Sequence, residues 1–546
     1  MARLDPSDAD REWVEVARAV DRSPFGGDFN TGHEVCSRYS RRSGVALTVV
    51  HPDGSRDRWT YGELDRAAAR LARVLHDNGL RPGDRVAGLL SRQVETWIVA
   101  VAAWRSGLVF VPLFGGFGAD AIGLRMVAAD VHTVVADSAY LETLDEAMNR
   151  HSLDPFVLAC GRVRPEHAVR PWLWDEIDAV TTDGPITTTT VHDLATILFT
   201  SGTTGAPKGC AMPHGALLSV LPYVRHVVGG TTGSVFSTAD PGWAYGLYTT
   251  GAAVLATGRP LVVYSGTSFV PENWHRVAVE EAVTVMATAP SAVRRLTSTF
   301  RERGFPPRLG NVVVAGEPLT EAVAGDWAAL GAPPIRNGYG LSEIGMVLAD
   351  TVTSPTGSQR PGSLAGAVPG FDAYLAQRDG RPVAPGEPGL VAIRRPRFPM
   401  STGYVNAPDL WAQRWVDDVY VTEDRAVREE PGGAWTISGR DDDIMVIAGH
   451  NISPVEVESA VLELAEITEA AAVSHHDAER GAVVKVVAVA DQAAAAGPAL
   501  ADRVRDAVSR SVGKFAVPRV VEFASALPRT EVGKLRRAAL REKPAG

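Results

Sequence analysis

Hydrophobic positions alternate between helical and strand patterns in residues 59–135. In the first helical stretch the apolar residues recur every three or four positions, as on a helix with one buried face: Leu64, Ala67, Ala68, Leu71 and Leu75. Asn78 predicts the end of this helix, and a strand follows over Arg85–Leu90. The order repeats as a helix over 94–106 and a strand over 109–112. This alternation predicts a largely parallel sheet covered by helices on both faces.

Later parts of the chain continue the α/β pattern. Buried strands are predicted within 194–199, at the end of 281–290 and over Asn311–Ala315, whereas the Pro- and Thr-rich residues 151–190 are typical of a connecting segment. Beyond residue 443 the pattern predicts a smaller unit: a strand at 444–447, a helix from Pro454, a strand at 483–489 and an alanine-rich loop at 490–499.

Composition bounds the classes of protein. The 546 residues exceed what one core usually organises, so we expect at least two domains. A net charge of −10, from 54 basic and 64 acidic residues, disfavours a nucleic-acid or anionic-membrane partner. Cys36, Cys160 and Cys210 form neither a disulfide framework nor a metal pattern. With a polar, acidic start and no long apolar run, these features predict a soluble, cytoplasmic protein without a transmembrane segment.

One loop carries the strongest chemical signal. Residues 198–209 read LFTSGTTGAPKG, a predicted strand end followed by glycines, hydroxyl side chains and one cation; the potential ligands are Thr200, Ser201, Gly202, Thr203, Thr204, Gly205 and Lys208. Dense backbone and hydroxyl donors beside a lysine suit a polyphosphate. The pattern differs from a Walker loop because Lys208 is followed by Gly209 rather than by serine or threonine.

This loop resembles the phosphate loop of the adenylate-forming (ANL) superfamily, which contains acyl-CoA synthetases, firefly-type luciferases and peptide-synthetase adenylation domains. The resemblance extends over roughly residues 40–540, with the motifs in the family's order. It implies an α/β fold with a large N-terminal adenylate-forming domain, 1–440, of parallel and mixed sheets covered by helices. It also implies a small α+β C-terminal domain, 441–546, that moves on a hinge.

A second motif, residues 337–343, reads NGYGLSE. The Tyr339 ring offers a stacking face for a purine, and the Glu343 carboxylate is a hard ligand of the kind that holds Mg²⁺ beside phosphates. By resemblance, Tyr339 lies on adenine, Ser342 near the α-phosphate or carboxylate, and Glu343 and Thr200 at the metal. The resemblance also assigns the following residues to ATP binding: Gly316, Glu317, Pro318, Asn337, Gly338, Gly340, Asp424 and Arg440.

The acyl site and the second half-reaction are implied in the same way. Trp243, Tyr245, Gly246, Ala315 and Gly340 are expected at the acyl pocket, and the lack of a bulky residue at Gly340 predicts an acid larger than acetate: medium-chain, aromatic or polycyclic. Asp442 would be the hinge, Gly449 and His450 would line the CoA tunnel, and Lys534 would be the catalytic lysine that acts with Lys208 and Glu343.

The implied activity converts a carboxylic acid, with MgATP, to an acyl-adenylate and then, with coenzyme A, to an acyl-CoA. Glu423, Val446 and His450-Asn451 depart from the family pattern, the last two on the expected CoA face. Two other readings stay open. One is a stand-alone adenylating enzyme that passes its product to a carrier protein or partner enzyme. The other is a non-catalytic nucleotide-binding relative acting as an interaction protein, which the presence of Lys208 and Lys534 disfavours. A luciferase-like oxygenase is also disfavoured, because the resemblance is closer to acyl-CoA synthetases.

Overall fold

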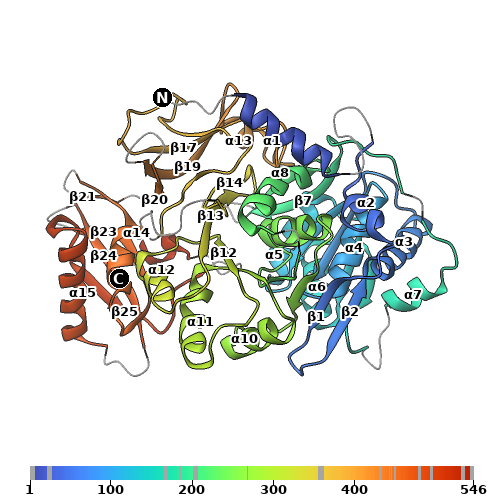
Figure 1. The fold of residues 1–546 in the computed structure, drawn as a ribbon, viewed down its shortest axis with the longest axis horizontal. Helices are drawn as coiled ribbons and strands as arrows, with labels where there is room; N and C mark the ends of the chain where they lie inside the picture. Colours follow the sequence, from blue (N-terminus) through green and yellow to red (C-terminus); the bar gives the residue numbers. More distant parts are fainter. Residues whose placement is uncertain are drawn as a thin grey trace.

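A computed structural model gives the fold (Figure 1). It describes residues 6–20, 28–164, 170–184, 186–200, 207–230, 232–266, 268–353, 362–428, 433–441, 443, 445–447, 450–477, 481–491, 496–529 and 535–541. Within these residues, no helix is both long enough and apolar enough to cross a membrane.

A six-stranded sheet holds the first half of the chain. Its order is β6 (Phe156–Cys160), β5 (Thr133–Asp137), β3 (Arg85–Leu90), β4 (Val109–Phe114), β7 (Leu194–Thr200) and β8 (Lys208–Pro213), parallel except for the last pair. Alternate residues of its strands enter two different apolar clusters, so both faces are covered. Helix α3 (Tyr61–Asp77) precedes β3, and the helices that follow β3, β4 and β5 are α4 (Val94–Arg105), α5 (Ala119–Ala129) and α6 (Leu141–His151). The predicted helix–strand alternation is confirmed.

Local chemistry explains where the first of these helices begins and ends. The Thr60 hydroxyl accepts from the Glu63 N–H, and the Glu63 carboxylate accepts from the Thr60 N–H, which makes a complete capping box. The helix ends at Asn78, and Gly79 follows with φ +93°. A left-handed glycine terminates a helix at little steric cost. The predicted end is therefore confirmed.

A nine-stranded sheet forms the second layer. Its order is β15 (Gly366–Ala367), β14 (Gly345–Ala349), β13 (Ile335–Leu341), β12 (Asn311–Ala315), β11 (Val285–Thr288), β9 (Val235–Ser237), β10 (Leu261–Tyr264), β1 (Val45–Val50) and β2 (Arg56–Thr60). Its helices are α9 (Ala253–Ala256), α10 (Pro271–Glu280), α11 (Pro290–Arg303) and α12 (Glu321–Ala328). The predicted strands at 285–288 and 311–315 are confirmed, and β13 carries the second motif.

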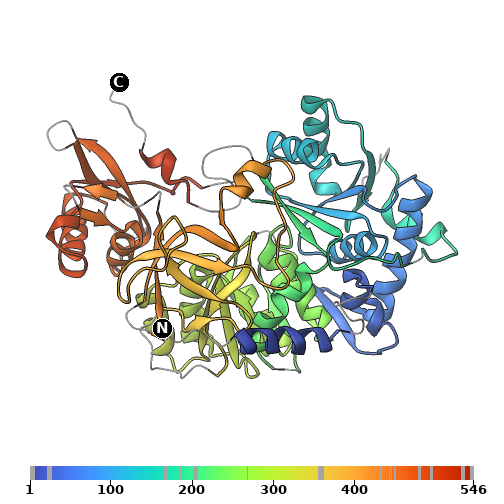
Figure 2. The same cartoon turned by 90° about the horizontal axis from the view of Figure 1, so that it is seen from above.

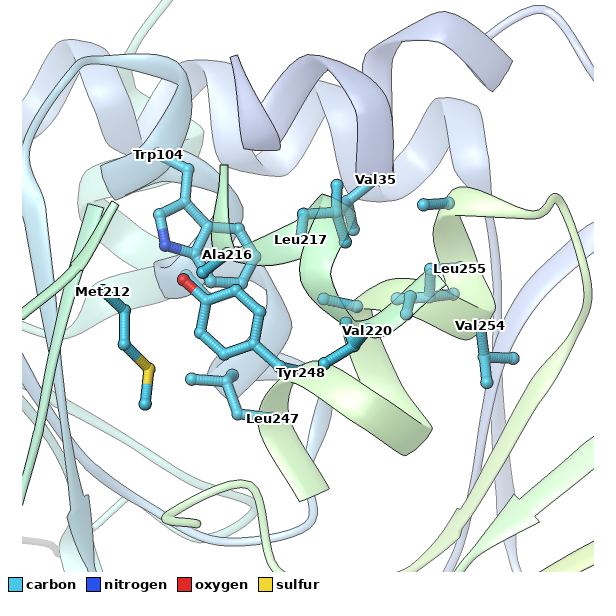
Figure 3. Close-up of a cluster of buried hydrophobic side chains, with 14 of the residues drawn as sticks. Val35, Trp104, Met212, Ala216, Leu217, Val220, Leu247, Tyr248, Val254 and Leu255 are labelled. Atoms are coloured by element: carbon cyan, nitrogen blue, oxygen red, sulfur yellow. The ribbon is translucent and has the colours of Figure 1, made fainter. Parts of the chain in front are cut away.

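The two layers enclose the largest apolar cluster. All twelve residues of α4 are buried, as are all eight of α8 (Ala216–Tyr223). In Figure 3, Trp104 of α4, Leu217 of α8 and Tyr248 point toward one another. Two segments in this region are π-helical, η3 (Val224–Val228) and η4 (Tyr245–Ala252).

A five-stranded sheet completes the large domain: β16 (Ala373–Ala376), β17 (Gly389–Arg394), β18 (Trp415–Val416), β19 (Val419–Arg428) and β20 (Trp435–Arg440). Accompanying elements are α1 (Pro6–Arg18), α2 (Thr31–Val35), η1 (Ser37–Tyr39), η2 (Ser138–Tyr140), α7 (Leu173–Ala179) and α13 (Pro408–Ala412).

The C-terminal elements form a separate lobe at one end of the molecule, orange to red in Figures 1 and 2. Strands β23 (Ile467–Asp477), β24 (Gly481–Ala490) and β25 (Val520–Phe523) make one sheet, and β21 (Met445–Ile447) pairs with β22 (His450–Ile452). Helices α14 (Pro454–Leu462), α15 (Pro498–Ser511) and α16 (Arg537–Arg541), with η5 (Lys514–Ala516), complete it. This lobe has its own apolar cluster. The predicted small α+β domain is confirmed.

Two segment assignments need correction. Residues 151–190 are more than a connection, because they contribute β6 to the sheet and α7 beside it. The five-residue apolar run of β6 is short, and periodicity does not distinguish such a strand from a loop. At the other end of the chain, α15 begins inside the predicted loop 490–499, since Pro498 occupies the first helical turn. Proline is favoured there because it has no N–H to satisfy.

Candidate active site

The described ends of the phosphate loop lie on adjacent strands. β7 ends at Thr200, β8 begins at Lys208, and the two residues are paired across an antiparallel ladder. The Thr200 hydroxyl donates to the Lys208 carbonyl at 3.5 Å. The remaining loop residues, Ser201, Gly202, Thr203, Thr204 and Gly205, lie outside the described residues. This strand–loop–strand arrangement differs from the strand–loop–helix of a Walker site.

A distant segment fastens the start of β8. The Val405 N–H donates to the Gly209 carbonyl at 2.8 Å. The Asn406 side chain donates to the Pro207 carbonyl at 2.8 Å and accepts from the Gly209 N–H at 3.0 Å. These bonds hold the lysine-bearing end of the loop. The sequence reasoning missed residues 401–406, because nothing in their pattern marks a contact so far along the chain.

Glu343 and Lys208 approach the same side chain, Tyr404. The Tyr404 hydroxyl donates to Glu343 Oε1 at 2.6 Å, and Lys208 Nζ lies 5.7 Å from the centre of the Tyr404 ring. Burial, and then the charge of Glu343, raise the pKa of the Tyr404 phenol. Tyr404 therefore remains a donor at neutral pH and orients the carboxylate beside the lysine. The structure brings together two of the predicted catalytic residues.

Tyr339 and Asp424 meet in the same way. The Tyr339 hydroxyl donates to Asp424 Oδ2 at 2.6 Å. Burial, and then Asp424, raise the pKa of the Tyr339 phenol. A carboxylate offers about four lone-pair sites, so Asp424 keeps capacity for further donors. The pair joins the predicted adenine-stacking ring to the predicted ribose acceptor, although 85 residues separate them in the sequence.

Glu423, which departs from the family pattern, is held by two arginines. Arg414 Nη2 lies 2.5 Å from Glu423 Oε1, and Arg440 bonds Glu423 Oε2. Arg440 is paired with Asp424 across the β19–β20 ladder. The glutamate therefore keeps the predicted nucleotide-binding arginine beside Asp424, the predicted ribose acceptor. The register of β19 shifts on both sides of this segment, between Leu390 and Ala392 on β17 and between Arg425 and Ala426 opposite β20.

The residues on either side of the predicted hinge form ion pairs with different parts of the protein. Asp441 pairs with Arg425 at 2.7 Å and also with Arg378, both in the large domain. Asp443 pairs with Arg541 at 2.7 Å, on the last helix of the small domain. Asp442 lies between these anchors and, with Gly449 and Lys534, outside the described residues; His450 lies on β22, and its side chain is not described.

Aromatic side chains form a wall near β4. The Trp243 ring centre lies 5.7 Å from that of Phe114 and 5.8 Å from that of Phe117. Tyr245 contacts Tyr223 edge to face at 6.4 Å. Gly246 has no room for a side chain, since a Cβ would lie 2.1 Å from the Asp240 carbonyl oxygen. The predicted acyl residues therefore lie in two separate aromatic contacts: Trp243 packs against the apolar cluster that contains Phe117, and Tyr245 packs against the largest cluster.

The glycines of the second motif serve close packing. A Cβ at Gly340 would lie 2.3 Å from the Gly345 carbonyl oxygen of β14, and one at Gly338 would lie 2.7 Å from the Tyr223 hydroxyl. Absence of these side chains therefore accommodates a strand and a tyrosine, and does not by itself leave space for a large acid. This removes the reason for which the sequence analysis expected a large substrate.

The other predicted ligands lie around β12 and β13. Gly316 follows β12 with φ +90° and open space where a Cβ would stand, and Ala315 is buried at the strand end. Glu317 accepts from the Ser291 N–H at 3.2 Å, Asn337 donates to the Gly362 carbonyl at 3.2 Å, and the Ser342 carbonyl accepts from the Ser401 hydroxyl at 2.8 Å. Pro318 lies in the same loop as Glu317.

The donor set suits a magnesium ion that arrives with its nucleotide. Among the described residues, no group of three or more histidine, cysteine or acidic side chains is arranged to hold a metal. Mg²⁺ in phosphate-transfer sites usually needs only one or two carboxylates, because phosphates and water complete its octahedron. Glu343, oriented by Tyr404 and close to Lys208, fits that requirement, with the Thr200 hydroxyl as the predicted second ligand.

Comparison with known proteins covers nearly the whole chain. Residues 37–405 match the family described as AMP-binding enzyme, and residues 456–534 match the AMP-binding enzyme C-terminal domain. The mitochondrial acyl-coenzyme A synthetase ACSM5 of Homo sapiens is 30% identical, over 95% of this chain and 91% of its own. The mitochondrial acyl-coenzyme A synthetase ACSM4 of Rattus norvegicus is 28% identical, over 96% and 92%.

Solved structures give the same result. A Brucella canis acyl-CoA synthetase has a TM-score of 0.76 at 32% identity, over 99% of this chain and 98% of its own. The anthranilate CoA ligase AuaEII, solved with anthranoyl-AMP, shares the fold with a TM-score of 0.84 at 21% identity, over 94% and 97%. From its motifs, its fold and these full-length matches, the chain belongs to the AMP-binding enzymes, the adenylate-forming superfamily.

Proposed function

We propose that this protein is an AMP-forming acid–thiol ligase, which activates a carboxylic acid with ATP and transfers the acyl group to coenzyme A. The observation that carries the proposal is the approach of Lys208 and Glu343 to Tyr404 and the bond of Tyr339 to Asp424, in a chain related over 95% of its length to an acyl-CoA synthetase.

In the first half-reaction a carboxylate oxygen attacks the α-phosphorus of ATP, and the bond to pyrophosphate breaks. The chain has to position the reactants and neutralise charge. Lys208 and the loop hydroxyls would hold the β- and γ-phosphates, and Glu343 would hold Mg²⁺, which supplies further neutralisation. Tyr339 would stack on adenine, with its hydroxyl bond to Asp424 keeping the ribose acceptor in place. Lys534 would neutralise the carboxylate and α-phosphate oxygens.

In the second half-reaction the CoA sulfur attacks the acyl carbonyl carbon, the bond to AMP breaks, and the thiol proton passes to solvent. We propose that the small domain rotates about Asp442 between the halves, which withdraws Lys534 and brings the Gly449–His450 loop to the CoA path. The anchoring of Asp441 to the large domain and of Asp443 to the small one supports a pivot between them. The proposed domains are 1–440 and 441–546, with the pivot at Asp442 near the start of the second.

The acid is proposed to be larger than acetate, in the medium-chain, aromatic or polycyclic range. The aromatic contacts of Trp243 with Phe114 and of Tyr245 with Tyr223 support an apolar acyl site. A cytoplasmic location is also proposed, supported by three buried cysteines without disulfides.

The test is acid-dependent ATP–pyrophosphate exchange over acetate, octanoate and benzoate, repeated with CoA to look for thioester. We expect exchange with the larger acids and thioester when CoA is present. Exchange without thioester would favour a carrier protein or partner enzyme as acceptor. Absence of exchange with every acid in a folded protein would contradict the proposal.

A further inference from the structure

Two buried tyrosine hydroxyls beside the proposed acyl site have no hydrogen-bond partner. Tyr223 is the last residue of α8 and is fully buried, and its hydroxyl is unpaired. Tyr245 begins η4, and its hydroxyl is buried and unpaired as well. The rings meet edge to face, at 76° between planes; the two hydroxyls are close enough to influence each other's pKa, but no hydrogen bond of acceptable geometry joins them. Buried hydroxyls are rarely left unpaired, because each then loses its hydrogen bonds to water and gains none within the protein.

The pair lies beside β13, the strand that carries the predicted adenine-stacking residue. The Tyr223 hydroxyl would be 2.7 Å from a Cβ at Gly338, so it lies against β13 one residue before Tyr339. Tyr245 is itself a predicted acyl residue and is two positions along the chain from Trp243, another one. A group held between these hydroxyls would therefore be next to the place where acid and nucleotide must meet.

The backbone around both tyrosines is unusual. The π-helical segment η3 begins directly after Tyr223, and η4 begins at Tyr245 and continues for eight residues. π-Helical turns are rare, are less favourable than α-helix, and are frequent at functional sites. Tyr245 thus lies on a π-helical segment and Tyr223 directly precedes one, and such segments are frequent at ligand sites.

Neighbouring protein groups do not satisfy the pair. Asp350 is near enough to influence the pKa of Tyr223, but its carboxylate accepts from the Asn337 and Ala365 N–H groups, at 2.9 and 2.8 Å, and not from the Tyr223 hydroxyl. Burial raises the pKa of both phenols, so both keep their protons at neutral pH. The pair therefore presents donors that call for an oxygen acceptor.

We propose that the acid substrate carries a carbonyl or hydroxyl oxygen remote from its carboxylate, and that Tyr223 and Tyr245 recognise this oxygen. The inference rests on the proposed function and specifies its substrate class. It separates this chain from a ligase of plain alkyl or unsubstituted aromatic acids. A site built to bind an oxygen discriminates strongly against an analogue that lacks it, because its own polar groups are then left unpaired.

The test uses acids matched in shape. The two pairs are 4-acetylbenzoate with 4-isopropylbenzoate, and 7-oxooctanoate with 7-methyloctanoate, in each of which an oxygen replaces a methyl group. The readout is the ratio of kcat/KM within a pair, measured by ATP–pyrophosphate exchange. We expect a ratio of about 10 or more in at least one pair, since hydrogen-bonding sites commonly discriminate by larger factors. In Tyr223→Phe and Tyr245→Phe the ratio should fall toward one.

Tyr248→Phe is the matched control. Tyr248 is equally buried, but its hydroxyl already bonds the Thr196 hydroxyl at 2.9 Å, so its removal should lower Tm and leave the ratio unchanged. Tyr223→Phe should leave the Tm of the free protein unchanged or higher, because it removes an unpaired group. A lowered Tm would show that a buried water or a protein group already satisfies the hydroxyl, which contradicts the proposal.

The inference and the proposed function fail differently. Exchange with ratios near one in both wild-type pairs, or ratios that survive both phenylalanine variants, would overturn the inference and leave the adenylating activity standing. No exchange with any acid would overturn both.

Discussion

The nucleotide side and the acyl side of the proposed active site differ in how their polar groups are paired. On the nucleotide side, Tyr339 bonds Asp424 and Tyr404 bonds Glu343, both at 2.6 Å. On the acyl side, the hydroxyls of Tyr223 and Tyr245 are buried without a partner. The side that meets the same substrate in every turnover is preorganised, which is how protein groups best stabilise developing charge. The other side keeps its hydrogen-bonding capacity for the acid.

The largest expected effect falls on the first half-reaction. Removing one preorganised group aimed at developing charge costs about 10²–10³ in rate, so Lys534→Ala should abolish most adenylation. Thioester formation from a supplied acyl-adenylate should be largely retained, because the proposed rotation withdraws Lys534 before that step. Rates of both half-reactions in the folded variant measure this. Equal loss in both would contradict the rotation and the division of the site.

The next largest effect on the adenylation rate is expected from a change at Glu343, the predicted metal ligand. Glu343→Gln removes the carboxylate but keeps the shape, and should lower adenylation about 10–100-fold with a raised Mg²⁺ requirement, as for loss of one charged ligand. Tyr404→Phe is the matched variant: it removes only the bond that orients Glu343. It should cost about tenfold or less, as for one hydrogen bond to a charged group. If Tyr404→Phe is as damaging as Glu343→Gln, the tyrosine itself contacts substrate.

Restricting the proposed hinge should slow only the second half-reaction, thioester formation. Asp442→Pro fixes φ near roughly −65° and should restrict rotation. Pyrophosphate exchange should survive better than overall CoA ligation. Asp441→Asn is the control, since it keeps the backbone free and weakens only the arginine anchors. An unchanged ligation rate in Asp442→Pro would place the pivot elsewhere.

The last prediction is that the preference for an oxygen-bearing acid does not change with pH. Burial raises the pKa of Tyr223, Tyr245, Tyr339 and Tyr404, so these phenols stay protonated where an exposed tyrosine, with a pKa of about 10, would begin to ionise. The kcat/KM ratio of 4-acetylbenzoate to 4-isopropylbenzoate should therefore be constant from pH 7 to about pH 10. A ratio that falls between pH 8 and 9 would mean that a more exposed group recognises the oxygen.

Sequence patterns predicted what depends on local periodicity and short motifs. They gave the helix–strand order from Arg85 onward, the small C-terminal domain, and the residues Lys208, Tyr339, Glu343 and Asp424. Those motifs could be read because glycine, hydroxyl and acidic residues occur together at short spacing.

Contacts between distant segments were not predictable in this way. Tyr404 lies 61 residues from Glu343, and Asn406 lies 199 residues from the carbonyl of Pro207 that it contacts. The small size of Gly340 was interpreted as space for substrate, whereas β14 occupies that space. A single sequence does not show which neighbour fills the volume that a glycine leaves.

The central claim is that this chain uses ATP to join a carboxylic acid to CoA through an acyl-adenylate. The most direct measurement is the product balance of a reaction containing acid, MgATP and CoA. The proposed reaction predicts one AMP and one pyrophosphate for each acyl-CoA formed, and release of AMP only when acid is present. Formation of ADP and orthophosphate, or release of AMP and pyrophosphate without thioester, would contradict it.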